Sequence, residues 1–202
     1  MLEEKLIIFV KNEEAGKVKT RLAKTVGDEK ALEIYRKLLT YTRDQVQPLR
    51  VIKEVWYSLF IEKNDLWSTG DFKKQLQKGD GLGERMSEAF RRSFEEESME
   101  NVVIIGSDCA ELTTEILGEA FRQLEDHDIV IGPADDGGYY LLGMSRFIPA
   151  LFTEISWSTG AVLEQTLEKA DKQHASYHKL EELHDVDEEK DWELIKYKFE
   201  SE

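Results

Sequence analysis

The chain has 202 residues, 41% of them hydrophobic, and carries 42 acidic against 27 basic side chains, for a net charge of −15. This length and apolar content predict one folded domain that spans residues 1–202. Because so acidic a surface repels polyanions, we expect no nucleic-acid partner.

The cysteine content and the absence of long apolar runs bear on the compartment. Cys109 is the single cysteine, which excludes an intrachain disulfide and fits a reducing compartment. The first residues lack the pattern of a signal peptide, and no run reaches the roughly 18 apolar residues that span a bilayer. We therefore expect a cytoplasmic protein with no membrane partner.

The predicted elements alternate in type along the chain. Apolar runs predict strands at residues 6–10, 51–61, 101–106, 128–133 and 139–143. Helical spacing and capping residues predict helices at residues 28–46, 82–97, from 113 onward, 160–174 and 188–199. With no linker or repeat, this order predicts an α/β protein: a three-layer α/β/α sandwich with a mostly parallel, mixed sheet.

The first candidate site is the loop after the strand at residues 6–10. Four cations, Lys11, Lys17, Lys19 and Arg21, surround Gly16 in this loop. In so acidic a chain the cluster favours phosphate binding, because cationic side chains and backbone N–H groups bind phosphate oxygens. Neither a G-x-G-x-x-G motif nor a P-loop is present, and a solvated basic loop is the alternative.

A glycine-rich loop at residues 79–85 is the second candidate. Gly81 and Gly83 allow the backbone to approach a ligand closely, and Arg85 lies early in the helix that follows. We expect these three residues to contact the nucleotide or its phosphates. A flexible turn is the alternative.

Carboxylates follow the buried strand at residues 101–106 and recur near the C-terminus. Asp108 follows the strand, where α/β proteins bind ligands, although it is equally suited to cap a helix. Asp185 and Asp187 supply further carboxylates, and Mg²⁺ or Mn²⁺ takes one or two of these together with phosphate oxygens. The sequence therefore predicts a metal site at Asp108, with Asp187 or Asp185 as partner. His184 has no cysteine or second histidine at the spacing of a zinc site, so we do not expect zinc here.

A second acidic turn precedes the strand at residues 139–143. Asp135 and Asp136 are candidates for acceptor contact or for a general base. The residues expected to contact substrate or acceptor are Gly137, Gly138, Tyr139 and Trp157. An ordinary turn, and a core position for Trp157, are the alternatives.

The remaining reactive side chains are assigned no chemistry. Cys109 has no histidine near it in sequence, so we expect a small core residue and not a nucleophile. His127, His174 and His178 are expected on the surface.

Six motifs in order give the chain a resemblance to a known family. They are residues 11–12 with 16–22, 81–86, 106–109, 132–140, 157–159 and 184–187. Together they resemble the DUF2064 family, the radical-SAM/selenodomain-associated transferase group, which includes arsenosugar-biosynthesis-type glycosyltransferases. The resemblance covers essentially the whole chain.

This resemblance implies a nucleotide-diphospho-sugar transferase fold of the GT-A type, which nucleotidyltransferases share. It implies a nucleotide over the first-strand loop and a divalent metal at Asp108. The chain departs from the family pattern in two places: residues 13–15 stand where prolines are common, and Ala110 replaces the proline after the cysteine. Loop shape and substrate choice therefore stay open.

Three functions remain open at this point. The first is a transferase that moves a sugar from a nucleotide-sugar to a small-molecule acceptor, with Mg²⁺ or Mn²⁺ as cofactor. Lys17, Lys19 and Arg21 would hold its diphosphate. The second is a nucleotidyltransferase that joins an NTP to a phosphorylated small molecule and releases pyrophosphate. The third is a nucleotide-binding protein without catalysis.

Overall fold

One mixed sheet forms the centre of the protein. The computed structural model describes residues 3–68 and 71–199. Within these ranges seven strands pair in the order β3-β2-β1-β4-β6-β5-β7. β6 is antiparallel to both neighbours and the other pairings are parallel, which confirms the predicted sheet. The strands are β1 Glu4–Val10, β2 Ile52–Tyr57, β3 Phe72–Leu76, β4 Asn101–Ile105, β5 Ile129–Pro133, β6 Tyr139–Met144 and β7 Tyr177–Lys179.

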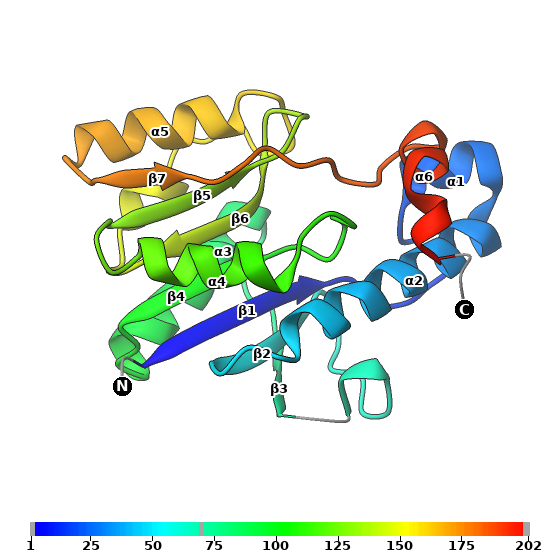
Figure 1. Cartoon of the computed structure of the whole chain (residues 1–202), viewed down its shortest axis with the longest axis horizontal. Helices are drawn as coiled ribbons and strands as arrows, with labels where there is room; N and C mark the ends of the chain where they lie inside the picture. Colours follow the sequence, from blue (N-terminus) through cyan, green and yellow to red (C-terminus); the bar gives the residue numbers. More distant parts are fainter. Residues whose placement is uncertain (1–2, 69–70, 200–202) are drawn as a thin grey trace.

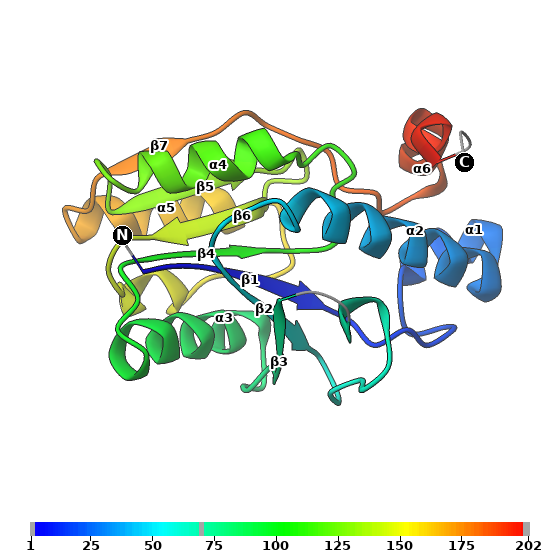
Figure 2. The ribbon, with the colours of Figure 1, turned by 60° about the horizontal axis from the view of Figure 1, so that its bottom comes forward.

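Helices cover both faces of the sheet, and this confirms the three layers. α2 and α4 lie on one face and α3 and α5 on the other (Figure 2). The helices are α1 Thr20–Val26, α2 Asp28–Val46, α3 Leu82–Arg91, α4 Thr114–Gln123, α5 Val162–Lys172 and α6 Glu189–Ile195. Short helical turns lie at Leu66–Ser68, Arg92–Glu96, Pro149–Phe152 and Lys196–Phe199. Across residues 3–68 and 71–199, none of these helices has both the length and the apolarity to cross a membrane.

Alternation along the central strands divides the core into two layers. In β1, Ile8 packs toward α2 and α4, whereas its neighbour Ile7 packs toward α3. All five residues of β4 are buried, as the four apolar residues after Asn101 predict for an inner strand of the sheet. The strands next to the site are therefore held from both sides.

A third apolar cluster lies beyond the strand ends. The outer side of α2, through Ala31, Ile34 and Leu38, packs with Leu22 of α1 and Trp192 of α6. Figure 1 shows α1 and α6 side by side at the end of the molecule toward which β1 points. The cluster holds α1, which begins after Lys19, and α6, which begins shortly after Asp187, against α2.

Three elements were not predicted, and one strand is shorter than expected. The strand expected at residues 51–61 ends at Tyr57. β3 lies at the edge of the sheet and is only partly buried, so it lacks an apolar run. β7 has three residues, and α1 has seven with Leu22 alone fully buried, so neither produces a clear periodicity. The threonine cap of α4 is confirmed: Thr113 Oγ1 accepts a hydrogen bond from the Ile116 N–H at 3.3 Å.

Candidate functional site

The C-terminal segment crosses the carboxyl ends of β5 and β4. The Leu183 N–H donates to the Pro133 carbonyl at 3.1 Å, and the Val186 N–H donates to the Asp108 carbonyl at 3.0 Å. Between them, Cys109 and Asp185 form an antiparallel bridge. These backbone bonds place the acidic segment of residues 185–187 beside Asp108.

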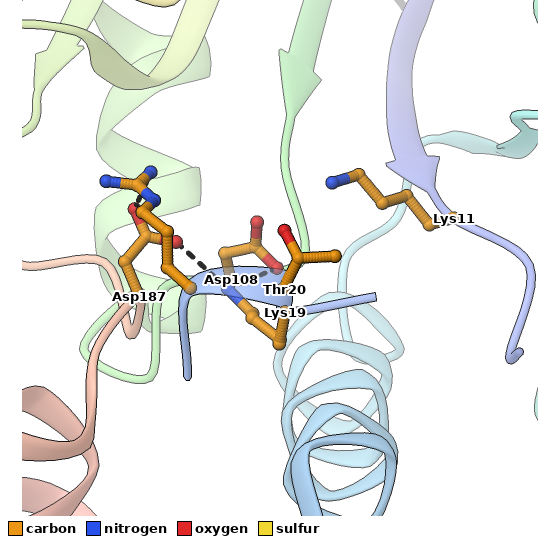
Figure 3. Close-up of a pocket in the computed structure, with 6 residues that line it drawn as sticks. Lys11, Lys19, Thr20, Asp108 and Asp187 are labelled. Atoms are coloured by element: carbon orange, nitrogen blue, oxygen red, sulfur yellow. Dashed lines mark hydrogen bonds and ion pairs between the residues drawn. The ribbon is translucent and has the colours of Figure 1, made fainter. Parts of the chain in front are cut away.

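A small cavity lies at this edge of the sheet. It has a volume of about 80 Å³ and is lined by Lys11, Lys19, Thr20, Arg21, Asp108 and Asp187; we name it the anion cavity. Lys11 follows β1, Asp108 follows β4, Asp187 precedes α6, and the other three residues begin α1. Figure 3 shows the Lys19 side chain between the two aspartates, with Lys11 reaching toward them from the end of β1.

Lys19 lies at the centre of the charge network. Its Nζ is 2.9 Å from Asp108 Oδ1 and 3.6 Å from Asp187 Oδ1, and its side chain is only 4% exposed. Arg21 Nη2 lies 2.5 Å from Asp187 Oδ2 on the solvent side. The two carboxylates thus share one buried ammonium, and Asp187 has a second, exposed cation.

The backbone and the ammonium of Lys19 are both unusual. Its φ of 47° and ψ of 46° put a non-glycine residue in the left-handed region, which costs about 1–3 kcal/mol. Lys19 Nζ lies at ion-pair distance from Asp108 but without hydrogen-bond geometry. The buried Nζ therefore donates no hydrogen bond to any of the described residues. Ser98, Glu154, Ser158 and His174 also have positive φ values but are exposed, so among these residues it is the burial of its charge that sets Lys19 apart.

Asp185 lies next to the anion cavity but does not line it. Its side chain is partly buried, and burial together with the negative charge of Asp108 raises the pKa of its carboxyl to about 7. Lys19 opposes this rise and Asp187 adds to it. The three predicted metal ligands are therefore close enough to interact electrostatically, and two of them face the cavity.

The donor set fits a hard divalent cation only in part. Asp108 and Asp187 approach one cation, Lys19 Nζ, from two sides, and Mg²⁺ or Mn²⁺ accepts a pair of carboxylates in that arrangement. Within the described ranges no group of three or more His, Cys, Asp or Glu side chains is arranged to hold a metal. A metal here would need its remaining ligands from phosphate oxygens and water.

Buried hydrogen bonds hold the first loop in place. Tyr35 Oη accepts from the Lys11 N–H at 2.8 Å and lies 3.3 Å from Ser107 Oγ. The buried Asn12 side chain accepts from the Leu59 N–H at 3.0 Å. Sequence reasoning missed these supports and the cavity residue Thr20, although Asn12 and Thr20 fall inside the first motif.

Gly16 and Lys17 lie outside the cavity lining. Gly16 has a φ of +74° and forms the turn before the cationic residues. Lys17 is exposed, unlike Lys19 two positions later. The structure thus separates the four predicted cations: Lys11, Lys19 and Arg21 converge, and Lys17 faces solvent.

The glycine-rich loop does not line the anion cavity. Arg85 Nε donates to the Gly79 carbonyl at 2.9 Å, so its side chain shapes its own loop. A Cβ on Gly83 would lie 2.3 Å from Trp157 Nε1, so this glycine makes room for the indole. Gly81 is exposed at the start of α3.

The acidic turn is exposed and tightly built. Asp135 and Asp136 face solvent, and Asp136 Oδ1 accepts from the Gly138 N–H at 2.9 Å. A Cβ on Gly137, whose φ is +83°, would lie 2.2 Å from the Gly160 carbonyl oxygen. Tyr139 packs against the α3 side of the core and its hydroxyl is buried. The turn contributes two exposed carboxylates, and the negative charge of Asp136 acts on Asp185.

A second cavity, which the sequence did not predict, lies on the other side of Lys11. It has a volume of about 500 Å³. Its lining comes from the end of β1 and the loop after it, from β2 and the loop after it, and from α2: residues 10–13, Tyr57, Phe60, Glu62, Asn64, Asp65, Leu66, Trp67, Arg36, Leu39 and Thr40. The rings of Tyr57 and Trp67 are buried at its wall. Arg36 Nε and Glu13 Oε2 pair at 2.8 Å on its rim. We name it the second cavity.

The other reactive side chains take no part in either cavity. Cys109 is 6% exposed in the core, as predicted, and burial raises the pKa of its thiol to about 12. The rings of His127 and His178 pack against each other with centroids 5.5 Å apart, while His174 is exposed. His184 Nδ1 lies 3.1 Å from Glu111, and this carboxylate raises the pKa of the imidazole.

The sheet order and its single antiparallel strand β6, with a charged cavity at the carboxyl edge, define a GT-A-like fold of the kind found in nucleotide-diphospho-sugar transferases and nucleotidyltransferases. Within this class, the chain belongs to the DUF2064 family, described as an uncharacterized protein conserved in bacteria, whose model matches residues 42–159. The family resemblance and the fold predicted from the sequence are thereby confirmed. No curated protein matches the chain.

Solved structures extend the comparison. A protein of Desulfovibrio desulfuricans G20 with the provisional name nucleotide-diphospho-sugar transferase is 32% identical, with a TM-score of 0.90 over 100% of this chain and 89% of its own. The inositol-1-phosphate CTP transferase of T. maritima has a TM-score of 0.61 at 15% identity, covering 99% of this chain and 97% of its own.

A third solved structure is a glycosyl-transfer enzyme with ligands. The glucosyl-3-phosphoglycerate synthase of Mycobacterium tuberculosis, solved with Mn²⁺, uridine-diphosphate and glucosyl-3-phosphoglycerate, has a TM-score of 0.58 at 12% identity. The match covers 91% of this chain and 70% of that one. At these identities the last two likenesses establish the fold alone.

Proposed function

We propose that this protein is a metal-dependent transferase that moves a sugar from a nucleotide-sugar donor to a small-molecule acceptor. The observation that carries the proposal is the anion cavity, where three cations and two carboxylates converge at the carboxyl edge of the sheet. In a chain with a net charge of −15, a cationic cavity beside a carboxylate pair suits a diphosphate bound together with a divalent metal.

The cavity residues divide into two roles. Lys11, Lys19 and Arg21 hold the diphosphate through charge-assisted contacts, and Asp108 with Asp187 holds Mg²⁺ or Mn²⁺. The metal, when bound, neutralises the charge that develops on the leaving nucleoside diphosphate. Asp135 and Asp136, exposed on the neighbouring turn, are the candidates for contact with the acceptor or for removal of its proton.

The second cavity offers room for the nucleoside half of the donor. The anion cavity, at about 80 Å³, is too small for a nucleotide, and Lys11 lines both cavities. A donor with its phosphates near Lys19 can therefore extend past Lys11, where Tyr57 and Trp67 supply an apolar wall.

A cavity-filling substitution tests this placement. Thr40 is exposed on α2 and lines the second cavity, so Thr40→Trp would occupy part of its volume. We expect nucleotide affinity to fall at least about tenfold while the melting temperature stays near that of the wild type. Unchanged affinity in a folded variant would place the nucleoside elsewhere and leave the phosphate assignment standing.

A nucleotidyltransferase is the second candidate function. Three cations in one small cavity also suit a triphosphate, and the inositol-1-phosphate CTP transferase of T. maritima has the same fold. The same cavity residues would then bind an NTP, and the acceptor would be a phosphorylated small molecule.

The decisive experiment separates these reactions by their products. Nucleotides and nucleotide-sugars are first screened by thermal shift with and without Mn²⁺; a specific ligand at 100 times its Kd stabilises by about 2.7 kcal/mol. Hits are then incubated with candidate acceptors. Release of a nucleoside diphosphate supports the proposal, and release of pyrophosphate supports the second candidate. Binding that is indifferent to metal, with no turnover, would indicate a non-catalytic nucleotide-binding protein.

A further inference from the structure

Lys19 occupies the place between the carboxylates at which a divalent cation would bind. Its ammonium approaches Asp108 at 2.9 Å and Asp187 at 3.6 Å, and the side chain is 4% exposed. No other residue of the anion cavity contacts both carboxylates among the ion pairs of the described chain. The carboxylate pair is therefore already partly neutralised by a covalently attached cation.

The ammonium is held there by charge and not by a hydrogen bond. Its buried Nζ has no hydrogen-bond partner among the described residues, although an ammonium has three donors to satisfy. Phosphate oxygens entering the cavity would offer this ammonium further acceptors. A bound phosphate would thus accept from donors that the present contacts leave without a hydrogen bond.

We propose that Lys19 is the resident counter-cation of the Asp108–Asp187 pair, and that its departure toward a bound phosphate makes the pair available to a divalent metal. Metal and nucleotide then bind cooperatively, because the phosphates remove the cation that competes with the metal. This inference rests on the proposed function, since it takes the phosphate ligand from there.

The start of α1 positions the Lys19 side chain. Lys19 precedes the first residue of α1 in the left-handed region, with φ 47°, and this directs its side chain into the cavity from the start of the helix. Lys17, two positions earlier in the same loop, faces solvent. Lys19 is in this sense a positioning residue for the metal site and a contact for phosphate.

The test measures Mn²⁺ binding to the purified chain without nucleotide, by electron paramagnetic resonance of free Mn²⁺. We expect Lys19→Met to bind Mn²⁺ roughly 10- to 100-fold more tightly than the wild type. Lys24→Met, which removes the same charge from an exposed position in α1, should bind as the wild type does. Lys19→Arg keeps the cation and should also retain weak binding.

A second variant guards against a folding defect. Lys19→Gly removes the same charge and relieves the left-handed backbone, so it should fold even if Lys19→Met does not. If both variants melt as the wild type does and bind Mn²⁺ no more tightly, the proposal is wrong. It is equally wrong if Lys24→Met tightens Mn²⁺ binding as much, because net charge alone would then explain the effect.

Nucleotide linkage gives a second readout. With the best nucleotide from the thermal screen, Mn²⁺ should tighten nucleotide binding to the wild type, and this gain should shrink in Lys19→Met. Tighter Mn²⁺ binding in the variants without turnover of any donor would refute the proposed function and leave this inference standing. Turnover by the wild type with unaltered Mn²⁺ binding in the variants would do the reverse.

Discussion

Two buried lysines illustrate how charge is retained inside this protein. Lys5 is fully buried in β1 and pairs with Glu54 at 3.5 Å and closely with Glu97, while Arg92 also pairs with Glu97 at 2.8 Å. Lys19 is buried between two aspartates. A buried charge is tolerated only with such partners. Lys5 lies at the amino end of β1 in a closed network of protein groups, whereas Lys19 lies in a cavity that a ligand can enter.

The network around Lys5 predicts acid sensitivity. Burial raises the pKa of the Glu97 carboxyl, but Lys5 and Arg92 outweigh it and hold that pKa below the usual 4.5. A carboxyl with a depressed folded-state pKa stabilises above the unfolded pKa, and that stability is lost as the pH falls through the folded pKa. We expect Glu97→Gln to lower the free energy of unfolding by about 1–3 kcal/mol at pH 7.

Urea unfolding at pH 7, 5 and 3.5 would check this prediction. The variant's stability should fall less than the wild type's between pH 5 and 3.5, because glutamine has no carboxyl group that takes up a proton in this range. Glu100→Gln, at an exposed position nearby, should keep the wild-type dependence. An acid dependence in Glu97→Gln equal to that of the wild type would contradict the assignment.

Asp108 is the residue on which the proposed chemistry most depends. Asp108→Asn keeps the size of the side chain and removes the charge that pairs with Lys19 and that the proposed metal site requires. If the metal contributes about 3 kcal/mol to the transition state, kcat should fall roughly a hundredfold. Steady-state kinetics on the donor found in the screen would measure this. Asp126→Asn, exposed after α4, is the matched control and should keep wild-type turnover.

At the scale of single elements, glycines in helices have opposite roles. Gly83 lies in the first turn of α3, where an added Cβ would meet the Trp157 indole at 2.3 Å. Gly118 lies inside α4, where an added Cβ would meet only the flexible Arg122 side chain at 3.4 Å. The same residue type is thus a packing requirement in α3 and a helix weakness in α4.

We predict opposite changes in stability for the two alanine variants. Gly118→Ala should raise the free energy of unfolding by about 0.5–1 kcal/mol, because alanine is the better helix former. Gly83→Ala should lower it by about 1–3 kcal/mol through overpacking. In a Trp157→Ala background the cost of Gly83→Ala should largely disappear, which denaturant unfolding of the double-mutant cycle would show. A persistent cost would exclude Trp157 as the cause.

For the whole molecule, the third apolar cluster connects stability to the site. Trp192 of α6 is 7% exposed and packs with α1 and α2, a few residues after Asp187. Val186, which directly precedes Asp187, donates its N–H to the carbonyl of Asp108 just after β4. Loss of the α6 contacts should therefore loosen the acidic segment as well as destabilise the chain.

Trp192→Ala tests this coupling. We expect a loss of about 3–5 kcal/mol in the free energy of unfolding, as for other buried aromatic truncations. Hydrogen exchange of the Val186 amide should accelerate more than that of amides in β4. Leu194→Ala, at a 74% exposed position of the same helix, should change stability by less than about 0.5 kcal/mol. Equal protection of Val186 in wild type and Trp192→Ala would contradict the coupling.

Strong local patterns were sufficient to predict most of the fold. The unbroken apolar runs of β1, β4 and β5 and the amphipathic α2 identify themselves, because burial on one or two faces leaves a periodic trace. Asp108 and the cationic loop also follow from position, since loops after parallel strands meet at one edge. The edge strands β3 and β7 and the short α1 leave no such trace, because few of their side chains are buried.

The composition of the anion cavity depended on long-range contacts. Sequence gives Lys17 and Lys19 equal standing, and only the left-handed backbone at Lys19 sends one of them inward. Likewise, Asp187 joins Asp108 because backbone bonds lay residues 183–186 across β5 and β4. Gly83 packs against the Trp157 indole, which comes from a distant segment of the chain. Residue types and strand positions can be read from the local sequence. The pairing of Lys19 with Asp108 and Asp187 depends on how distant segments pack, and that packing exists only in the folded chain.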